Sequence, residues 1–398
     1  MSSGRVYLDH AATTPVLPEV IDVVAALMRV LGNPSSLHGS GRAARKAVEE
    51  ARETVAAALS AAPGDVVFTS GGTEADNLAV KGLYWARRAA DPRRNRVLVS
   101  AVEHHAVTDT AEWLAKSEGA QIEWLPVDAD GRLVIDELHS ALARDPESVA
   151  LVSVMWANNE VGALQPIGEV VAAASRHGIP VHSDAVQAVG SVAVDFAASR
   201  LTAMTVSGHK LGGPMGSGAL LVRRDADLVP VLHGGGQERE IRSGTLDAPS
   251  IAGFAAAVSA TVSSRAERAI QVGELREELV RGVLDAVPDA VVNGPSDPRR
   301  RLPGIAHVSF PGCEGDAMMM LLDARGIDCS TGAACAAGVP EPSHVLLAMG
   351  AAPLLARSSL RFSLGHSSSR ADVDALVAAI GPVAERARAA GYMNVKGS

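Results

Sequence analysis

Short apolar runs that alternate with helical segments restrict the fold of this chain more than any other feature. The runs are rich in Val, Ile and Leu, and several are followed by a helical pattern, as at 75–88 and 168–177. Strands that alternate with helices predict an α/β fold with a mainly parallel sheet. The runs that we interpret as strands lie at 66–70, 97–100, 150–156, 179–182, 203–206 and 218–222.

The chain is long enough for two domains. Its 398 residues, of which 47% are hydrophobic, suffice for a large core and a smaller companion. A long amphipathic pattern at 266–286 predicts a helix that leads into a smaller α+β domain, with strands at 305–310 and 360–364. We expect the N-terminal arm, 7–17, to pack near the active site and not to start the main sheet. The predicted boundaries are 15–262 for the large domain, and 1–14 together with 263–398 for the small one.

Charge and cysteine content exclude several classes of protein. The net charge of -9 leaves no basic footprint for nucleic acid, so we expect no direct nucleic-acid partner. Three cysteines without a secretory signal argue against a disulfide scaffold and favour a reducing cytoplasm. No run of about 18 apolar residues occurs, so we expect no membrane span. We predict no metal site.

The residues around Lys210 are typical of a Schiff-base site. A Ser-Gly-His-Lys segment at 207–210 directly follows the strand at 203–206. A lysine at a strand end can be held partly desolvated and within reach of an aldehyde. Asp184, at the end of a neighbouring strand, is the partner that a pyridinium nitrogen needs. Alone, Lys210 is more often a surface charge and Asp184 a helix cap, but together they indicate pyridoxal phosphate (PLP).

Other small polar segments can hold the phosphate and the ring of such a cofactor. Gly72 and Thr73 open a helix after a strand, where backbone N–H groups bind anions, although Thr73 can also be an ordinary N-cap. Ser207 and His209 can donate to the same phosphate. A third polar loop, ending at Thr245, has anion-binding character, and Gln187 can reach the phenolic oxygen of the ring.

Three further positions allow both a functional and a structural interpretation. His104 and His105 follow the second strand, and either imidazole can stack on a cofactor ring and move protons or serve as a helix cap. The Asn158–Asn159 pair after the third strand can bind the phenolic oxygen or a substrate carboxylate, and it equally favours a turn. Arg361 is a charge inside an apolar strand pattern, so it needs either a substrate carboxylate or an internal salt bridge.

One cysteine stands apart from the other two. Cys335 lies in a run of small residues at 330–338, which predicts a mobile surface loop spanning about 328–342. A free cysteine is usually a small buried hydrophobe, but one in such a loop is better explained as an exposed nucleophile. Cys313 and Cys329 lie in or near predicted strands, and for them we favour the buried interpretation.

Taken in order, these residues resemble the cysteine desulfurases, which are class-V aminotransferase-like PLP enzymes. The likeness starts in the N-terminal segment 7–14 and covers nearly the whole chain, and the loop around Cys335 is similar to that of the NifS/IscS-type group. The resemblance implies a homodimer of PLP fold type I, in which Thr245 reaches the phosphate in the other subunit's site. The matching segments are 72–74, 103–104, 158–160, 182–187, 207–210, 233–236, 242–245, 341–344 and 360–365.

The resemblance also implies a reaction and a role for each residue. L-cysteine is the substrate, and Arg361 with Asn159 binds its carboxylate. Lys210 carries the cofactor and moves the α-proton, while His104 stacks on the ring and moves protons. Cys335 takes the sulfur as a persulfide, and alanine is released. An acceptor protein then receives the sulfur for iron–sulfur clusters, thio-tRNA, DNA phosphorothioation or a natural product, between which the sequence does not choose.

The chain departs from the usual family pattern at three places. Ala333-Ala334 precedes and Ala336 follows the cysteine, and His366 stands where an Arg is frequent. None of these changes removes a catalytic group. Selenocysteine lyase or another class-V PLP enzyme is the alternative activity, and a non-catalytic scaffold is the alternative class. Cys335 argues against transamination, and an intact PLP site argues against a scaffold.

Overall fold

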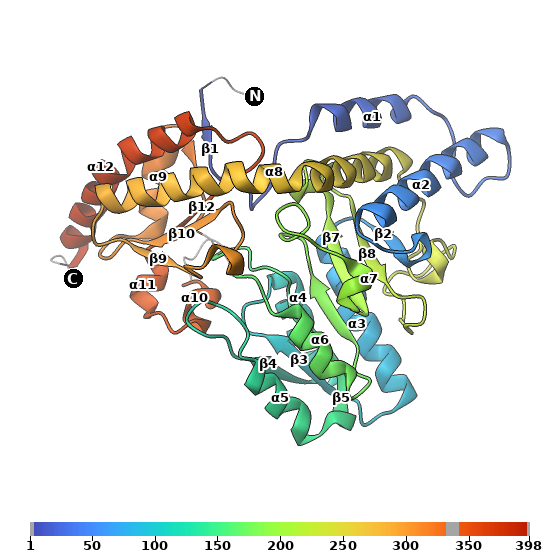
Figure 1. Ribbon diagram of the computed structural model, residues 1–398. Helices are drawn as coiled ribbons and strands as arrows, with labels where there is room; N and C mark the ends of the chain where they lie inside the picture. The colour runs from blue at the N-terminus through green and yellow to red at the C-terminus, as the bar shows by residue number, and fades with distance from the viewer. Residues whose placement is uncertain (1–3, 332–341, 396–398) are drawn as a thin grey trace.

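The structure is a computed structural model that describes residues 4–331 and 342–395, with side chains up to residue 389. It consists of a larger and a smaller body joined by one long helix, α8 (Ala248–Ala286), which runs across both (Figure 1). The predicted α/β class is confirmed, because the central sheet is mostly parallel and helices cover it.

The central sheet has seven strands in the order β2-β8-β7-β6-β5-β3-β4. β8 runs antiparallel to both of its neighbours, and all other neighbours pair in parallel. The strands are β2 (Val66–Thr69), β3 (Arg96–Ser100), β4 (Gln121–Leu125), β5 (Val149–Ser153), β6 (Val181–Asp184), β7 (Ala203–Ser207) and β8 (Gly218–Val222).

Helices pack on both faces of this sheet, because successive side chains of a strand point to opposite faces. In β3, Val97 and Val99 pack in a cluster with residues of α3 and α4, whereas Leu98 packs in the cluster on the other face. A strand that is buried on both faces needs apolar residues in succession, which explains the runs in the sequence. The helices of the larger body are α1 (Pro18–Met28), α2 (Gly39–Ala58), α3 (Gly72–Ala90), α4 (His105–Glu118), α5 (Ile135–Arg144), α6 (Ile167–Ser175) and α7 (Phe196–Ser199).

The smaller body contains an antiparallel sheet in the order β12-β10-β9. A separate parallel pair joins β1 (Val6–Tyr7) to β11 (Ile327–Asp328), so the N-terminal strand lies among the C-terminal elements (Figure 1). As predicted, the arm does not enter the central sheet. The remaining elements are β9 (Val291–Asn293), β10 (Ile305–Ser309), α9 (Gly315–Asp323), α10 (His344–Ala348), α11 (Pro353–Arg357), β12 (Ser359–Ser363) and α12 (Arg370–Val395).

Two separate hydrophobic cores underlie the two bodies. The first half of α8, with Phe254 and Val258, packs in the core of the central sheet. Its second half packs from Val272 onward in a core that also includes Leu8 and residues of α12. The domain boundaries given above stay a prediction, and Ala11, Leu302 and Ile305, which they assign to the small domain, pack in the core of the central sheet.

Helix α8 and strand β4 show most clearly why some elements differ from the sequence prediction. Helix α8 begins at Ala248 and not near residue 266, because its first half is buried on several sides and its apolar residues recur too densely to show a helical period. Strand β4 was not predicted, because it is an edge strand in which Gln121 is exposed and Trp124 is 40% exposed.

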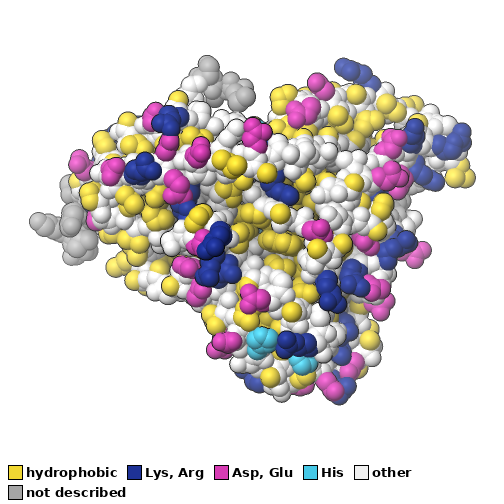
Figure 2. All heavy atoms as spheres, viewed as in Figure 1, with side chains coloured by type: hydrophobic (Ala, Val, Ile, Leu, Met, Phe, Trp, Pro, Cys, Tyr) yellow, Lys and Arg dark blue, Asp and Glu magenta, His cyan; other side chains and the backbone are white. Residues whose placement is uncertain are grey.

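The surface mixes both signs of charge. On the face shown in Figure 2, basic and acidic side chains are interspersed over the molecule. Within the described residues, no helix is both long and apolar enough to cross a membrane. Among the same residues, no group of three or more His, Cys, Asp and Glu side chains is placed to hold a metal ion.

Gly218 tests the close packing of the strand ends. A Cβ atom there would lie 2.7 Å from the Val206 carbonyl oxygen and 2.9 Å from the Cα of Gly71. Backbone atoms cannot rotate aside, so we expect Gly218→Ala to lower the free energy of unfolding by about 1–3 kcal/mol. The control Gly168→Ala lies in α6, where a Cβ would meet nothing within 4 Å, and it should leave stability unchanged or slightly higher. Denaturant unfolding followed by circular dichroism measures the stability of both variants. Equal free energies of unfolding for Gly218→Ala and Gly168→Ala would contradict the packing argument.

Candidate active site

The predicted site residues meet at the carboxyl edge of the central sheet. β2, β3, β5, β6 and β7 run in the same direction, so the segments that follow them come together at one edge. A cavity of about 370 Å³ opens there. It is lined by Gly72, Thr73, His104, Asn159, Asp184, Gln187, Ser207, His209, Lys210 and Arg361. Thr245 is not among its lining residues, and Cys335 lies outside the described residues.

Lys210 ends a short 3-10 helix, Gly208–Lys210, directly after β7. Its Nζ donates to the carbonyl oxygens of Ala11 (2.5 Å) and Ala12 (2.6 Å), so the N-terminal arm lies across the amine. Burial, assisted by the positive charge of Arg361, lowers the pKa of Lys210 to about 8. A substantial fraction of the amine is therefore neutral and nucleophilic near pH 7–8.

Asp184 ends β6 and faces the same cavity. Its Oδ1 accepts a hydrogen bond from the Val186 amide at 2.8 Å, so the residue also caps the turn, as the alternative interpretation predicts. Burial and the nearby Asp76 raise the pKa of Asp184 to about 7. A cation beside this carboxyl group would reverse that shift, and a protonated ring nitrogen is such a cation.

Two further buried carboxyl groups surround Asp184, and the sequence reasoning gave them no role. Asp76 Oδ1 lies 3.5 Å from His182 Nε2, and Glu103 Oε1 accepts from the Met155 amide at 2.6 Å. Each of these carboxyl groups has one oxygen, Asp76 Oδ1 or Glu103 Oε2, that is buried and accepts no hydrogen bond from a described residue. Burial raises the pKa of Asp76 to about 7 and that of Glu103 well above its usual range. The three buried carboxyl groups of Asp184, Asp76 and Glu103 would each be stabilised in the charged form by a nearby cation, so the site fits the pyridinium ring of PLP.

The start of α3, in the lining of the same cavity, fits a phosphate. Helix α3 begins at Gly72, and its N-cap is Gly71, whose φ of 143° is suited to glycine. Thr73 is therefore not the N-cap, and the first-turn N–H groups receive no side-chain cap. Those groups can bind an anion instead, with Ser207 and His209 beside them.

A salt bridge keeps an acidic residue from opposing that anion. Glu74 lies in the first turn of α3, where its negative charge would repel a phosphate. Arg242 Nε donates to Glu74 Oε1 at 2.7 Å, and the Ser70 amide donates to Oε2. The Arg242 segment therefore supports the phosphate end of the cavity without lining it.

The structure distinguishes the two adjacent histidines. His104 is the N-cap of α4, and its Nδ1 accepts from the Ala106 amide at 3.1 Å, which leaves Nε2 to carry the ring proton. Burial and the charge of Lys210 lower the pKa of His104 to about 4. His105 is half-exposed at the rim and pairs with Asp109. His104 lines the cavity with a neutral ring, so it is the histidine suited to stack on a cofactor ring.

The two adjacent asparagines also divide their roles. Asn158 is fully buried, and its amide binds the Val102 carbonyl and accepts from the amides of Glu160 and Val161, so it shapes the turn. Asn159 lines the cavity. Its position beside the other lining residues suits it to contact a ligand.

Arg361 satisfies both interpretations that the sequence left open. It is only 4% exposed, yet it lines the cavity. Its Nη2 donates to Asp9 Oδ1 at 2.9 Å, and its Nη1 donates to the Asn159 carbonyl at 3.0 Å. It has an internal salt bridge and remains placed to meet a substrate carboxylate.

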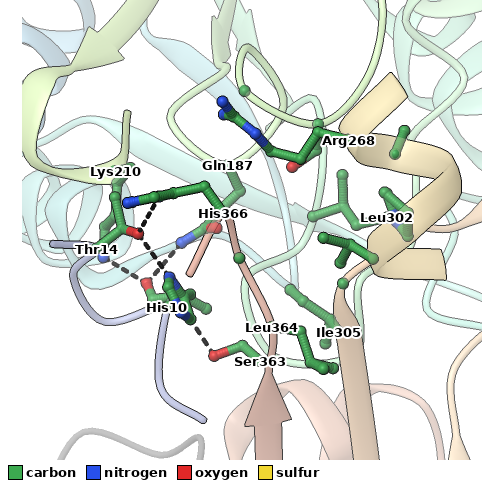
Figure 3. Close-up of a pocket in the computed structure, with 18 of the residues that line it drawn as sticks. His10, Thr14, Gln187, Lys210, Arg268, Leu302, Ile305, Ser363, Leu364 and His366 are labelled. Atoms are coloured by element: carbon green, nitrogen blue, oxygen red, sulfur yellow. Dashed lines mark hydrogen bonds between the residues drawn. The ribbon is translucent and has the colours of Figure 1, made fainter. Parts of the chain in front are cut away.

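A second, smaller cavity of about 80 Å³ lies behind the N-terminal arm (Figure 3). Gln187 reaches the arm there, because its Nε2 donates to the Ala11 carbonyl at 2.8 Å. The side chains of His10, Thr14 and His366 form a chain of hydrogen bonds in this cavity. The departure at His366 therefore concerns the packing behind the arm and not the lining of the main cavity.

Both described cysteines are poor nucleophiles. Cys313 is buried in the smaller core, and burial raises its pKa. Burial and the charges of Asp9 and Asp328 raise the pKa of the partly buried Cys329 to about 12. The described residues that flank 332–341 reach the main cavity, because Ser330 and His344 both line it.

The pKa of Lys210 can be measured directly. After hydroxylamine has removed any bound aldehyde, we expect the rate of amine labelling at Lys210 to be half-maximal near pH 8, because burial disfavours the ammonium form. Arg361→Gln removes a positive charge that lowers this pKa, so its midpoint should move to higher pH. Peptide mass spectrometry reports the labelling, and an unchanged midpoint in the variant would contradict the electrostatic coupling.

Comparison with known proteins agrees with this geometry. Residues 6–376 match the family described as Aminotransferase class-V. The chain is 56% identical over 384 residues to the IscS-like cysteine desulfurase of Mycobacterium tuberculosis, which covers 96% of this chain and 97% of that protein. It is 40% identical over 385 residues to cysteine desulfurase NifS of Azotobacter vinelandii, with 96% and 93% covered.

Solved structures show the same relationship. A structure described as a NifS-like protein aligns with a TM-score of 0.88 at 33% identity, over 96% of this chain and 100% of that chain. A structure described as SspA in complex with cysteine aligns with a TM-score of 0.78 at 31% identity, over 91% of this chain and 99% of that chain. The chain therefore belongs to the class-V aminotransferase family and, within it, to the PLP-dependent cysteine desulfurases.

Proposed function

We propose that the protein removes sulfur from L-cysteine and leaves it as a persulfide on Cys335, with L-alanine as the other product. One observation carries this proposal. The cavity that holds Lys210, Asp184 and Arg361 is also lined by Ser330 and His344, which flank the segment containing Cys335. Five residues span at most about 18 Å, so Cys335 is within chain reach of the cavity from Ser330.

The lining residues divide the cofactor between them. Lys210 would take the aldehyde carbon, Asp184 would hold the ring nitrogen, and Gln187 would reach the phenolic oxygen. His104 would stack on the ring, and Gly72 and Thr73 with Ser207 and His209 would bind the phosphate. When bound, PLP supplies an electron sink for the bonds at the α-carbon of the substrate.

The protein's own residues bind the substrate and move its protons. Arg361 and Asn159 bind the carboxylate, which fixes the α-carbon near Lys210. Once freed from the cofactor, Lys210 can accept and return the α-proton near neutral pH, because its pKa is lowered. His104 Nε2–H can donate toward the substrate, because Nδ1 is already occupied by the Ala106 amide.

Cys335 acts as the sulfur nucleophile. Its thiolate attacks the substrate sulfur, so an S–S bond forms while the carbon–sulfur bond breaks. The electron pair of the broken bond stays with the substrate, whose carbon takes up a proton and leaves as alanine. The sulfane sulfur then passes to an acceptor protein that supplies iron–sulfur clusters, thio-tRNA or other sulfur-containing products in the cytoplasm.

We further propose that two copies of the chain complete two sites. Thr245 does not line the cavity of its own chain, which agrees with a role in the other subunit's site. Leu246, its neighbour, lines a surface pocket with Val30. Exposed apolar side chains cluster nearby in sequence, with Leu31 at 87% and Leu37 at 81% exposure. Burial of such side chains favours association with a second copy.

The sulfur-carrier role predicts a clear difference between cysteine variants. Cys335→Ser should lose nearly all alanine and protein-bound sulfane sulfur after addition of L-cysteine, because a hydroxyl cannot form the persulfide. Cys313→Ala should keep both products, since Cys313 is buried in the smaller core. Alanine assays and persulfide labelling measure the two products. Unchanged alanine release by Cys335→Ser would contradict the proposed carrier.

The shared-site proposal predicts complementation between two inactive proteins. Lys210→Ala loses its Schiff-base amine, and Thr245→Ala should bind PLP more weakly, so each is poorly active at limiting cofactor. A refolded equal mixture should recover about one quarter of wild-type activity, because half the dimers carry one intact site. Analytical ultracentrifugation checks the dimer, and no recovery in a dimeric mixture would refute the exchange of Thr245.

A further inference from the structure

We propose that Asp9 is a positioning residue for the substrate, which acts by holding the guanidinium of Arg361 toward the cavity. This inference rests on the proposed function, in which Arg361 binds the carboxylate of cysteine. Asp9 belongs to the N-terminal arm, is 352 residues from Arg361 in sequence, and is not among the residues that line the cavity.

The guanidinium of Arg361 is held at its two terminal nitrogens. Asp9 accepts from Nη2 at 2.9 Å, and the Asn159 carbonyl accepts from Nη1 at 3.0 Å. Nε is buried and has no hydrogen-bond partner among the described residues. Asp9 is thus the only described carboxylate in ion-pair contact with Arg361, and a charge-assisted hydrogen bond is the stronger kind.

Asp9 can hold Arg361 because the arm is itself fixed. The Tyr7 hydroxyl donates to the carbonyl oxygens of Asp9 (3.1 Å) and Thr13 (2.7 Å). Asp9 also forms a β-bridge with Ser363, two residues beyond Arg361 on the same strand. Residues two apart on a strand share a face, so this register places the carboxylate of Asp9 beside the arginine.

Electrostatic repulsion makes this contact necessary. Lys210 and Arg361 carry like charges in the same cavity, and the charge of Arg361 lowers the pKa of Lys210. Without Asp9 the guanidinium would keep only the hydrogen bond to the Asn159 carbonyl, and repulsion from Lys210 would displace it and increase its mobility. Substrate binding would then have to order it again. Asp9 also repels a substrate carboxylate, but it contacts Arg361 from outside the cavity lining, so we expect the loss of positioning to dominate.

Asp9 variants test this role in the PLP-loaded enzyme. Asp9→Ala should raise the KM for L-cysteine about 10-fold, with kcat within about 3-fold of wild type, because one charged hydrogen bond to the substrate-binding group is lost. Asp9→Asn should raise KM less, since its amide oxygen can still accept from Nη2. The control is Asp328→Ala, which removes a nearby carboxylate that bonds Arg5 and not Arg361, and its KM should match wild type.

Calorimetric titration with L-alanine supplies a readout that needs no turnover. L-Alanine carries the same carboxylate, so Asp9→Ala should bind it about 10-fold more weakly, while the cofactor absorbance stays as in wild type. A wild-type protein that binds L-alanine but releases no sulfur from cysteine would contradict the proposed function and leave this test intact.

Three results would overturn the role of Asp9. These are unchanged KM and L-alanine affinity in Asp9→Ala, a fall in kcat at constant KM, or an equal effect in Asp328→Ala. Thermal unfolding identifies a variant that does not fold. If Asp9→Ala does not fold, Asp9→Asn tests the role of Asp9 instead, and a wild-type KM in that variant would refute the proposal.

Discussion

The site depends on charged groups that the fold buries without fully neutralising them. Lys210, Arg361, Asp184 and Asp76 line one cavity, and the carboxyl group of Glu103 is buried near the two aspartates. Burial disfavours every charged form, so it lowers the pKa of the lysine and raises those of the carboxyl groups. A cationic ring beside Asp184 would lower the raised pKa of that carboxyl group, whereas the lowered pKa of Lys210 leaves a neutral amine for the aldehyde, and both effects favour PLP binding.

This arrangement requires segments that are far apart in the sequence. The carboxyl edge of the central sheet supplies Lys210 and Asp184, whereas Arg361 comes from the smaller body. The N-terminal arm connects the two parts, because its carbonyl oxygens bind Lys210 and its Asp9 binds Arg361. The arm is itself held by the pairing of β1 with β11, so displacement of any one of these segments would disturb both the lysine and the arginine.

Local patterns in the sequence were sufficient to predict the site residues that directly follow strands. Lys210 and Asp184 could be predicted because apolar runs mark buried strands, and ligands gather at their carboxyl ends. Of the two interpretations left open for Thr73, the N-cap is wrong, because Gly71 is the N-cap and adopts a backbone angle that the sequence pattern does not reveal. The contact of Asp9 with Arg361 could not be predicted, since no local period relates residues 352 positions apart. Asp76 was the missed residue with a local signal, because it lies one turn beyond Gly72 on α3.

The buried charges also bear on which cysteine can carry sulfur. A thiol must ionise to attack the substrate sulfur. Cys329 is the described cysteine nearest to Arg361 in the chain, but burial and the carboxylates of Asp9 and Asp328 raise its pKa to about 12. Cys313 lies in the hydrophobic core of the smaller body. The sequence contains three cysteines, and the burial that activates Lys210 makes two of them poor nucleophiles, which supports the proposal that Cys335 carries the sulfur.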